Sequence, residues 1–344
     1  MRVAINGFGR IGRAIYRYNL VKGLFDVVAI NDVNPDKNNL AYLLKYDSTY
    51  GRLDREVVVD GEDLVVDGAR SRIFCEPRME NVPFDDRGAD IVIDASGITA
   101  NLHTAHKLKA KGVRHVIITN SPDTDVPYAS VILGINEQTL TPESFLVSSS
   151  ICDAVALVPV MHLLHAAFGV DHGFVTTLHP WLNYQNLLDG PSLSHSDPGH
   201  IYSTYVLGRS SVNALIPKTT TVLKASRKIL PWMDNKFMCL SYRVPTSIVS
   251  SSDVTVKLGS KVRRDDVVEL FEKAEHEQVH RLIRNSHEPL TSLDFTGIEH
   301  GVSIDHRWTM VEVDSFLKLI LWYDNEWGYG ARAAELVAYL GGLA

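Results

Sequence analysis

A single cysteine and the residues around it give the first indication of chemistry in this sequence. Cys152 follows the serine run 148–150 and precedes apolar residues at helical spacing that continue to Phe168. A serine is a preferred N-cap, so the pattern predicts a helix with Cys152 in its first turn. Free N–H groups and the helix dipole there favour an anion, which lowers the pKa of a thiol and makes it a nucleophile. From this stretch alone, the alternative of a small buried hydrophobic cysteine stays open.

The beginning of the chain has the pattern of a dinucleotide-binding turn. A short buried strand runs into a GxGxxG turn at residues 7–12, and a helical pattern follows. These glycines permit a tight turn and the close approach of a pyrophosphate to a helix N-terminus. The next strand ends in Asp32, about 20 residues after the last glycine, where an acid accepts hydrogen bonds from a ribose. Because Asp32 would repel a 2′-phosphate and no arginine follows it directly, we expect NAD rather than NADP.

Strand and helix patterns alternate through residues 1–150, which is typical of a doubly wound parallel sheet. The region 56–75 departs from this alternation and reads as hairpins of short strands. Ser96 and Gly97 follow the buried strand 89–94, so they are expected at the edge of the sheet where ligands bind.

The pattern changes after the cysteine. Residues 174–179 alternate as in a half-buried antiparallel strand, and residues 264–283 have a helical pattern. The region 180–214 is long and polar, and we expect an ordered functional loop there.

These elements predict an α/β chain of two domains. We expect an N-terminal doubly wound Rossmann domain that binds NAD over residues 1–151, joined by a C-terminal helix at 328–344. Residues 152–327 are expected to form an α+β catalytic domain with a mixed or antiparallel sheet.

Composition limits the classes of protein that fit. The chain has 344 residues, of which 45% are hydrophobic and 22% charged, as in a globular protein with a full core. The net charge of −7 is not gathered into a block, so neither a nucleic-acid nor a membrane partner is expected. Three scattered cysteines favour a reducing compartment, and the histidines and cysteines predict no metal site. Since a strand pattern starts at once, no signal peptide is expected, and we predict a cytoplasmic protein.

Several longer motifs occur in the order of one known family. They are AINGFGRIGR, INDVN, LLKYDSTYGR, DASG, ILGIN, TTLH, RVPT and WYDNEWGYG. Over essentially its whole length the chain resembles the phosphorylating glyceraldehyde-3-phosphate dehydrogenases, and erythrose-4-phosphate dehydrogenase is a sister branch with the same motifs. The resemblance implies NAD-dependent oxidation of a small, sugar-phosphate-like aldehyde through a cysteine thiohemiacetal and thioester. It also implies a homotetramer, in which the long loop reaches toward a neighbour's cofactor site.

The resemblance assigns roles to individual residues. It implies that Cys152 is the nucleophile and that His179 is the base, which pairs with the thiol and takes a proton as hydride leaves. The cofactor-binding residues it implies are Gly7, Gly9, Arg10, Ile11, Gly12, Asp32, Ser96, Gly97, Thr119, Asn325 and Tyr329. The residues it implies for the substrate and other anions are Arg243, Arg209 and Thr220, to which we add Asp153.

The chain departs from the family beside its nucleophile. The family sequence Ser-Cys-Thr is replaced by Ile151-Cys152-Asp153. Ile151 cannot donate a hydrogen bond to the inorganic phosphate that cleaves the thioester. An ionised Asp153 would repel that anion, and it should raise the pKa of the adjacent thiol.

Two further departures affect anion binding. Leu182 replaces the threonine that holds the substrate phosphate in the family, and Thr221 stands in place of a glycine, close to an additional cation, Lys218. Release of the thioester therefore stays open between phosphate, bound through Arg209, Thr220 and Lys218, and water oriented by Asp153. A paralogue that binds NAD without turnover is a third alternative, and retention of the cysteine and histidine argues against it.

Overall fold

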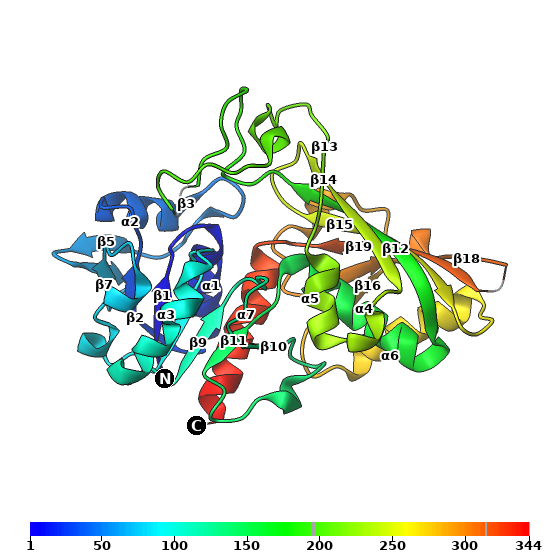
Figure 1. Ribbon diagram of the computed structural model, residues 1–344, viewed down its shortest axis with the longest axis horizontal. Coiled ribbons are helices and arrows are strands. Elements are labelled where there is room, and N and C mark those ends of the chain that lie inside the picture. The colour runs from blue at the N-terminus through cyan, green and yellow to red at the C-terminus, as the bar shows by residue number, and fades with distance from the viewer. Residues whose placement is uncertain (195–196, 314, 344) are drawn as a thin grey trace. The chain divides into compact units, whose positions relative to one another are not determined.

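The computed structural model describes residues 1–194, 197–313 and 315–343, and the chain divides into two compact units (Figure 1). The first unit contains Met1–Val131, Glu137–Ser150 and the end of the chain from Ala333. The second unit contains Ile132–Asn136 and Ile151–Arg332.

The first unit is built on a nine-stranded sheet with the order β10-β11-β9-β8-β1-β2-β7-β6-β5. Its parallel strands are β1 (Arg2–Asn6), β2 (Asp26–Asn31), β7 (Ala69–Phe74), β8 (Ile91–Asp94), β9 (His115–Ile118), β10 (Ala129–Ser130) and β11 (Leu146–Ser148). Two antiparallel strands, β5 (Val57–Asp60) and β6 (Asp63–Val66), continue the sheet from β7 as a meander. The central strands are buried on both faces, as expected of a parallel sheet covered by helices. The predicted doubly wound domain is confirmed.

Helices and short turns connect these strands. The helices are α1 (Arg10–Lys22), α2 (Lys37–Lys45) and α3 (Ala100–Thr104), with 3₁₀ turns at Met79–Asn81, Phe84–Arg87, Ala105–Lys111 and Glu137–Thr139. A small hairpin of β3 (Tyr46–Asp47) and β4 (Gly51–Arg52) follows α2. Helix α1 ends at Lys22, and Gly23 caps it: its left-handed φ of 63° lets its N–H bond to the carbonyl of Asn19.

The second unit is built on a mixed sheet with the order β13-β14-β12-β15-β19-β17-β16, and β18 adds to β19. The strands are β12 (Val170–Pro180), β13 (Ile216–Lys218), β14 (Phe237–Val244), β15 (Ser250–Leu258), β16 (Ile283–Ser286), β17 (Val302–Asp305), β18 (Met310–Glu312) and β19 (Phe316–Tyr323). Strands β12 and β14 run parallel, whereas β12, β15 and β19 alternate in direction. The expected mixed sheet of an α+β domain is therefore present, and Figure 1 labels β12, β14, β15 and β19 beside one another.

The helices of the second unit are α4 (Cys152–Phe168), α5 (Val222–Ile229), α6 (Arg264–Glu277) and the start of α7 (Trp327–Gly342), with 3₁₀ turns at Tyr205–Gly208, Pro231–Met233, Ser292–Phe295 and His306–Trp308. Helix α4 is apolar on nearly all sides and is buried from Asp153 to Met161. Such a helix belongs in a core rather than at a surface. None of the helices in the described residues combines the length and the hydrophobicity of a membrane-spanning segment.

Two local predictions are wrong. Helix α6 ends at Glu277 and not at residue 283, because the side-chain oxygen of Gln278 accepts the N–H groups of Leu282 and Ile283 and turns the chain into β16. The N-cap of α4 is Ile151 and not a serine, and no side-chain hydrogen bond caps this helix within the described chain. Ser150 instead has a left-handed φ of 63° and turns the chain just before the helix.

The close packing of α1 against β1 gives a testable prediction. A Cβ on Gly12 would lie 2.1 Å from the carbonyl oxygen of Gly7, whereas a Cβ on Gly9 would meet nothing within 4 Å. We therefore expect Gly12→Ala to lower the free energy of unfolding by about 1–3 kcal/mol, as overpacking does. Gly9→Ala is the matched control and should unfold close to the wild type. The measurement is urea unfolding followed by circular dichroism, and equal midpoints for the two variants would contradict the steric explanation.

Candidate functional site

The first group of predicted site residues lies along one edge of the parallel sheet. Gly7, Asp32, Ser96 and Thr119 follow directly after or close behind β1, β2, β8 and β9. These strands are neighbours and parallel, so their carboxyl ends meet at the same edge. In open α/β sheets this edge is where ligands bind.

The turn after β1 is shaped to receive an anion. Gly7 has a φ of +91°, and a Cβ there would lie 2.6 Å from the backbone nitrogen of Ser96. Helix α1 begins at Arg10 with Gly9 as its N-cap, and its first turn has neither a side-chain cap nor an acidic residue in the described structure. The N–H groups at the start of this helix are therefore directed at the space where a pyrophosphate would lie. The guanidinium of Arg10 points elsewhere, since it pairs with Asp47.

The acid after β2 is held by backbone groups. One oxygen of Asp32 accepts the N–H of Phe8 at 2.7 Å, and the other accepts the N–H of Asn34 at 2.9 Å. This fixes the carboxylate beside the glycine turn, where the hydroxyl groups of a ribose can donate to it. Ser96 is fixed in a similar way, because its hydroxyl donates to Asp94 at 2.6 Å.

Gly97 and Thr119 complete this edge. Gly97 has a φ of +74°, with nothing within 4 Å of the position where a Cβ would be. The Thr119 hydroxyl donates to the carbonyl of Asp94 at 3.3 Å, and its N–H bonds to the same oxygen. The edge residues are thus tied to one another, and open space remains above Gly97.

The second group of predicted residues lies in the other unit, at the start of α4. The sulfur of Cys152 is 3.7 Å from Nε2 of His179 and 3.6 Å from Oδ1 of Asp153. His179 stands near the carboxyl end of β12, and both it and Asp153 are buried, whereas Cys152 is partly exposed. Asp153 also accepts the hydroxyl of Tyr323, from the end of β19, at 2.8 Å. The thiol, the imidazole and the carboxylate therefore form one group of contacting side chains. This group is accessible to solvent through the exposed side of the cysteine.

The imidazole of His179 is in a form that can accept a proton. Its Nδ1 is 2.8 Å from the carbonyl oxygen of Pro180, and because a carbonyl can only accept, Nδ1 carries the hydrogen. Burial lowers the pKa of His179 to about 4, and the positive charge of Arg243 contributes to this shift. At neutral pH the ring is therefore uncharged, and Nε2 presents a lone pair to the sulfur.

The thiol itself is not activated as the helix position predicts. Burial raises the pKa of Cys152 well above its usual value, and the negative charge of Asp153 raises it further. The backbone N–H of Asp153 and the charge of Arg243 act in the opposite direction without reversing the shift. The expected lowering by the helix N-terminus is thus outweighed, whereas the expected effect of Asp153 has the predicted sign. The resting pair is a neutral thiol beside a neutral imidazole.

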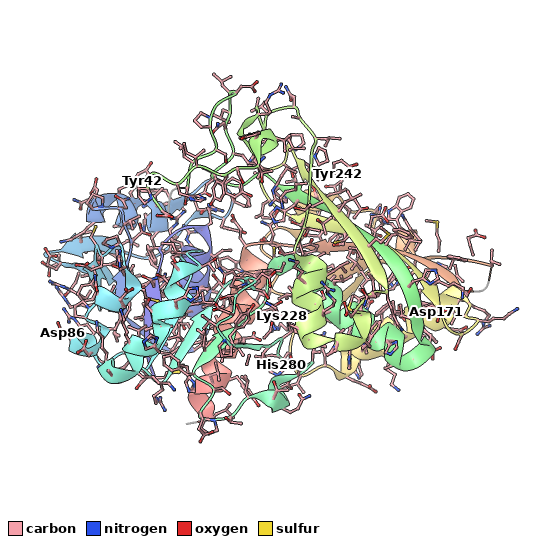
Figure 2. All side chains as sticks on the ribbon, viewed as in Figure 1. Tyr42, Asp86, Asp171, Lys228, Tyr242 and His280 are labelled. Atoms are coloured by element: carbon pink, nitrogen blue, oxygen red, sulfur yellow. The ribbon has the colours of Figure 1, made fainter. Side chains whose placement is uncertain are left out.

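A buried arginine lies next to the histidine. Arg243 follows Tyr242, which Figure 2 labels on β14, and it is the register partner of His179 on β12. Arg243 is 7% exposed; its Nη2 is 3.4 Å from the hydroxyl of Tyr184, and its Nε has no hydrogen-bond partner within the described chain. A buried guanidinium with an unused donor suits an anion, because burial of an unpaired charge is costly.

The remaining predicted anion residues are placed differently. Arg209 is exposed and pairs with Asp189 of the same loop at 2.7 Å. The hydroxyl oxygen of Thr220 accepts the N–H of Val222 at the start of α5 at 3.2 Å. Lys218 is half-buried at the end of β13, and its Nζ donates to the carbonyl of Thr219 at 2.6 Å. No described contact joins these three side chains to Cys152, so a phosphate site made from them is not assembled by direct contact.

Two predicted cofactor residues follow β19. Asn325 is buried, and its side-chain oxygen has no hydrogen-bond partner in the described residues. Tyr329 is buried in the first turns of α7. Sequence reasoning did not find Tyr323 as a site residue, although it belongs to the WYDNEWGYG motif, because its contact with Asp153 joins distant parts of the chain.

Comparison with known proteins agrees with the motifs. Residues 1–102 match the family model described as glyceraldehyde 3-phosphate dehydrogenase, NAD binding domain, and residues 151–325 match the C-terminal domain of the same enzyme. Glyceraldehyde-3-phosphate dehydrogenase 1 of Kluyveromyces lactis is 35% identical over 340 residues, which is 99% of each chain. The chain belongs to the glyceraldehyde-3-phosphate dehydrogenase family.

Other members of the family are similar to the same extent. Glyceraldehyde-3-phosphate dehydrogenase of Glossina morsitans morsitans is 34% identical over 98% of each chain. Glyceraldehyde-3-phosphate dehydrogenase 1 of Schizosaccharomyces pombe is 34% identical over 98% of this chain and 97% of its own. The chain is thus an NAD-dependent oxidoreductase of this family, and the edge residues of the first unit fit NAD: an uncapped helix N-terminus for its pyrophosphate and the fixed carboxylate of Asp32 for its ribose.

The effect of Asp153 on the thiol can be measured. We expect Asp153→Asn to lower the pKa of Cys152, because it removes a neighbouring negative charge that disfavours the thiolate. At pH 7.5 the thiolate fraction and the rate of alkylation by iodoacetamide should rise on the order of tenfold. The measurement is the pH profile of alkylation in a background in which Cys75 and Cys239 are serine. Asp189→Asn, on the exposed loop, is the control, and an unchanged profile in Asp153→Asn would rule out this source of the shift.

Proposed function

We propose that this protein oxidises a small aldehyde bearing a phosphate or another anionic group, with NAD as the oxidant. The observation that carries the proposal is the contact of Cys152 with an uncharged His179 beside the buried Arg243. In this proposal residues 1–151 and the helix at 328–344 form the NAD-binding domain, and residues 152–327 form the catalytic domain.

The geometry supports a sequence of proton transfers through His179. The thiol proton passes to the aldehyde oxygen as the sulfur adds to the carbonyl carbon, which gives a thiohemiacetal on Cys152. Nε2 of His179 is then placed to accept the hydroxyl proton, and NAD, when bound, would supply the acceptor for the hydride of the same carbon. The product of these steps is a thioester on Cys152. A neutral histidine suits this role, because its lone pair is free when the proton must leave.

The cofactor is held mainly by backbone groups in this proposal. The turn of Gly7, Gly9 and Gly12 with the first N–H groups of α1, at Arg10 and Ile11, binds the pyrophosphate. Asp32 accepts the ribose hydroxyls and disfavours a 2′-phosphate, so NAD is preferred over NADP. Ser96, Gly97 and Thr119 border the cofactor along the sheet edge. Asn325 supplies a buried amide that suits the nicotinamide carboxamide, and Tyr329 packs nearby.

The substrate's anionic group is assigned to Arg243. Its unused buried Nε and its position beside His179 place a positive charge near the reacting sulfur. The family threonine that shares this task is Leu182 here, which has no polar side-chain atom. The name of the relatives makes glyceraldehyde 3-phosphate the first aldehyde to test, and a substrate with a different anion fits the same arginine.

Release by water is a second candidate for the last step, and the environment of Asp153 favours it. The carboxylate contacts the sulfur, is oriented by Tyr323, and forms no ion pair in the part of the chain that the structure describes. Such a group would repel a phosphate dianion and can accept a proton from water that attacks the thioester. Phosphate remains the alternative, with Arg209, Thr220 and Lys218 as its ligands after a rearrangement of the loop.

Self-association as a homotetramer is also proposed. Four large apolar side chains are exposed on β12 and β14, and an apolar face of this kind on a sheet suits an interface between copies; they are Phe174, Leu178, Met238 and Leu240. Three more large apolar side chains are exposed on the long loop, which suits a second contact between copies; they are Leu187, Leu188 and Tyr205.

We also propose a cytoplasmic location with no nucleic-acid or membrane partner. The grounds are that the cysteines are free thiols and that the charge is evenly spread along the chain.

The catalytic assignment makes a direct prediction. Cys152→Ser should abolish NADH formation from glyceraldehyde 3-phosphate and NAD, because the hydroxyl is a much weaker nucleophile. His179→Asn should lower kcat about 10²–10⁴-fold, since it removes the proton acceptor. Cys239→Ser, which changes a thiol outside the site, is the control and should retain activity. NADH absorbance is the readout, and a fully active Cys152→Ser protein would contradict the assignment of Cys152 as the nucleophile.

The release step can be separated from oxidation. If water releases the acyl group, turnover should continue without phosphate or arsenate, and the acid formed in H₂¹⁸O should carry the label. Asp153→Asn should then leave the first NADH burst in place but slow later turnovers, about 10²–10⁴-fold if the carboxylate is the general base. A burst that stops after one equivalent in wild-type protein, and resumes when phosphate is added, would instead establish phosphorolysis.

A further inference from the structure

We propose that Cys152, Asp153 and His179 form a binding site for a zinc-like divalent metal ion, and that the ion coordinates the sulfur of the proposed nucleophile. The three residues offer a sulfur, a carboxylate oxygen and an imidazole nitrogen within 4.8 Å of one another. This is a mixed set of the ligands that Zn²⁺ takes in proteins, with three protein ligands and one open position.

The distances between the ligand atoms suit a tetrahedral ion. The sulfur lies 3.6 Å from the Asp153 oxygen and 3.7 Å from Nε2 of His179. Bonds of about 2.3 Å to sulfur and about 2.0–2.1 Å to nitrogen or oxygen, at a tetrahedral angle, separate such atoms by about 3.5–3.6 Å. The two distances from sulfur therefore match a tetrahedral site. The carboxylate oxygen and the imidazole nitrogen lie within 4.8 Å of each other, and they would move together as both bind the ion.

Outer hydrogen bonds already orient two of the ligands. Nδ1–H of His179 donates to the Pro180 carbonyl, which leaves Nε2 as the metal-binding nitrogen. The hydroxyl of Tyr323 donates to the Asp153 carboxylate at 2.8 Å. Metal-binding histidines and carboxylates depend on partners of this kind for orientation and affinity.

The charges around the site and its exposure to solvent favour a metal ion that binds reversibly. A thiolate and a carboxylate balance two positive charges, and coordination releases the thiol proton to solvent. The cations Arg243 and Lys218 lie on neighbouring strands and limit the affinity, so the metal should be exchangeable rather than permanent. Cys152 is partly exposed while its two partners are buried, so the fourth position faces the open side.

The departure from the family beside the nucleophile is what makes the site. A cysteine and a histidine alone provide two ligands, and Asp153 provides the third where the family has a threonine. Coordination makes the sulfur a weaker nucleophile and occupies Nε2 of His179, the proton acceptor of the proposed reaction, so Zn²⁺ should inhibit the oxidation reversibly. This last consequence rests on the proposed function, but metal binding does not.

The test uses the full-length, reduced protein after removal of metals with a chelator, and Co²⁺ as a spectroscopic probe. We expect one Co²⁺ per chain with a sulfur-to-cobalt charge-transfer band in the near ultraviolet, and displacement by Zn²⁺. The band should be lost in Cys152→Ser and kept in Cys75→Ser and Cys239→Ser. Asp153→Asn and Tyr323→Phe should each weaken the affinity for Zn²⁺ by about tenfold or more, the first through a ligand and the second through its outer partner.

A second measurement on the wild type covers the case in which a variant does not fold. Zn²⁺ should protect Cys152 from alkylation more than Cys75 or Cys239, as read by peptide mass spectrometry, and a chelator should restore the reaction. Absence of the charge-transfer band, its survival in Cys152→Ser, an unchanged affinity in Asp153→Asn, or equal alkylation of Cys152 with and without Zn²⁺ would each overturn the proposal. None of these readouts requires turnover, so an inactive protein would not obscure the result.

Discussion

The contact between a thiol and a buried carboxylate at the start of α4 is the constraint on which the catalytic unit depends. At a separation of 3.6 Å, a thiolate and an ionised Asp153 repel each other by about 1 kcal/mol in a water-like medium and about 4–5 kcal/mol at an effective dielectric constant of 20. The helix N-terminus and the hydroxyl of Tyr323 stabilise the carboxylate. The carboxylate next to the sulfur, together with burial, disfavours the sulfur anion.

This constraint changes how the nucleophile must work. A cysteine paired with a charged imidazole holds its negative charge before the substrate arrives, whereas here burial favours the uncharged form of both groups. The parallel register of β12 and β14 contributes, because it sets Arg243 directly beside His179, where its charge opposes protonation of the ring. The charge that develops on the substrate oxygen during attack can be stabilised by that same arginine. In the proposed function, activation of the thiol would then be coupled to the presence of substrate, and we expect the free thiol to react slowly with other electrophiles.

The sequence predicted the parts of the molecule that local patterns control. The GxGxxG turn, Asp32, Ser96 and Thr119 all follow strands, and parallel strands bring such residues to one sheet edge whatever the details of packing. Tyr323 and Asp153 are 170 residues apart in the chain, and no local pattern reports their hydrogen bond. The prediction of a serine N-cap was wrong for a similar reason. The backbone of Ser150 adopts a left-handed conformation, so the helix starts one residue later and Ile151 is its N-cap. Arg209 has a residue type that suits an anion site, but its guanidinium forms an ion pair with Asp189 of the same loop.

In the proposed function the two halves of the reaction place different demands on the protein, which accounts for a change in only one of them. Hydride transfer needs a fixed geometry between the sulfur, a proton acceptor and the cofactor, since a small misplacement greatly slows such a step. Cys152, His179 and the glycine turn all keep their family identities. Release of the acyl group needs an acyl acceptor, such as water or phosphate, and a side chain that deprotonates or orients this acceptor. Several residue types can provide that side chain. In the proposed function and the proposed metal site, replacement of threonine by Asp153 would leave the first half in place, exchange an anion-binding group for a base, and add a ligand atom beside the thiol. A single substitution can therefore change both the acyl acceptor and the affinity of the nucleophile for metals without disturbing the oxidation that precedes them.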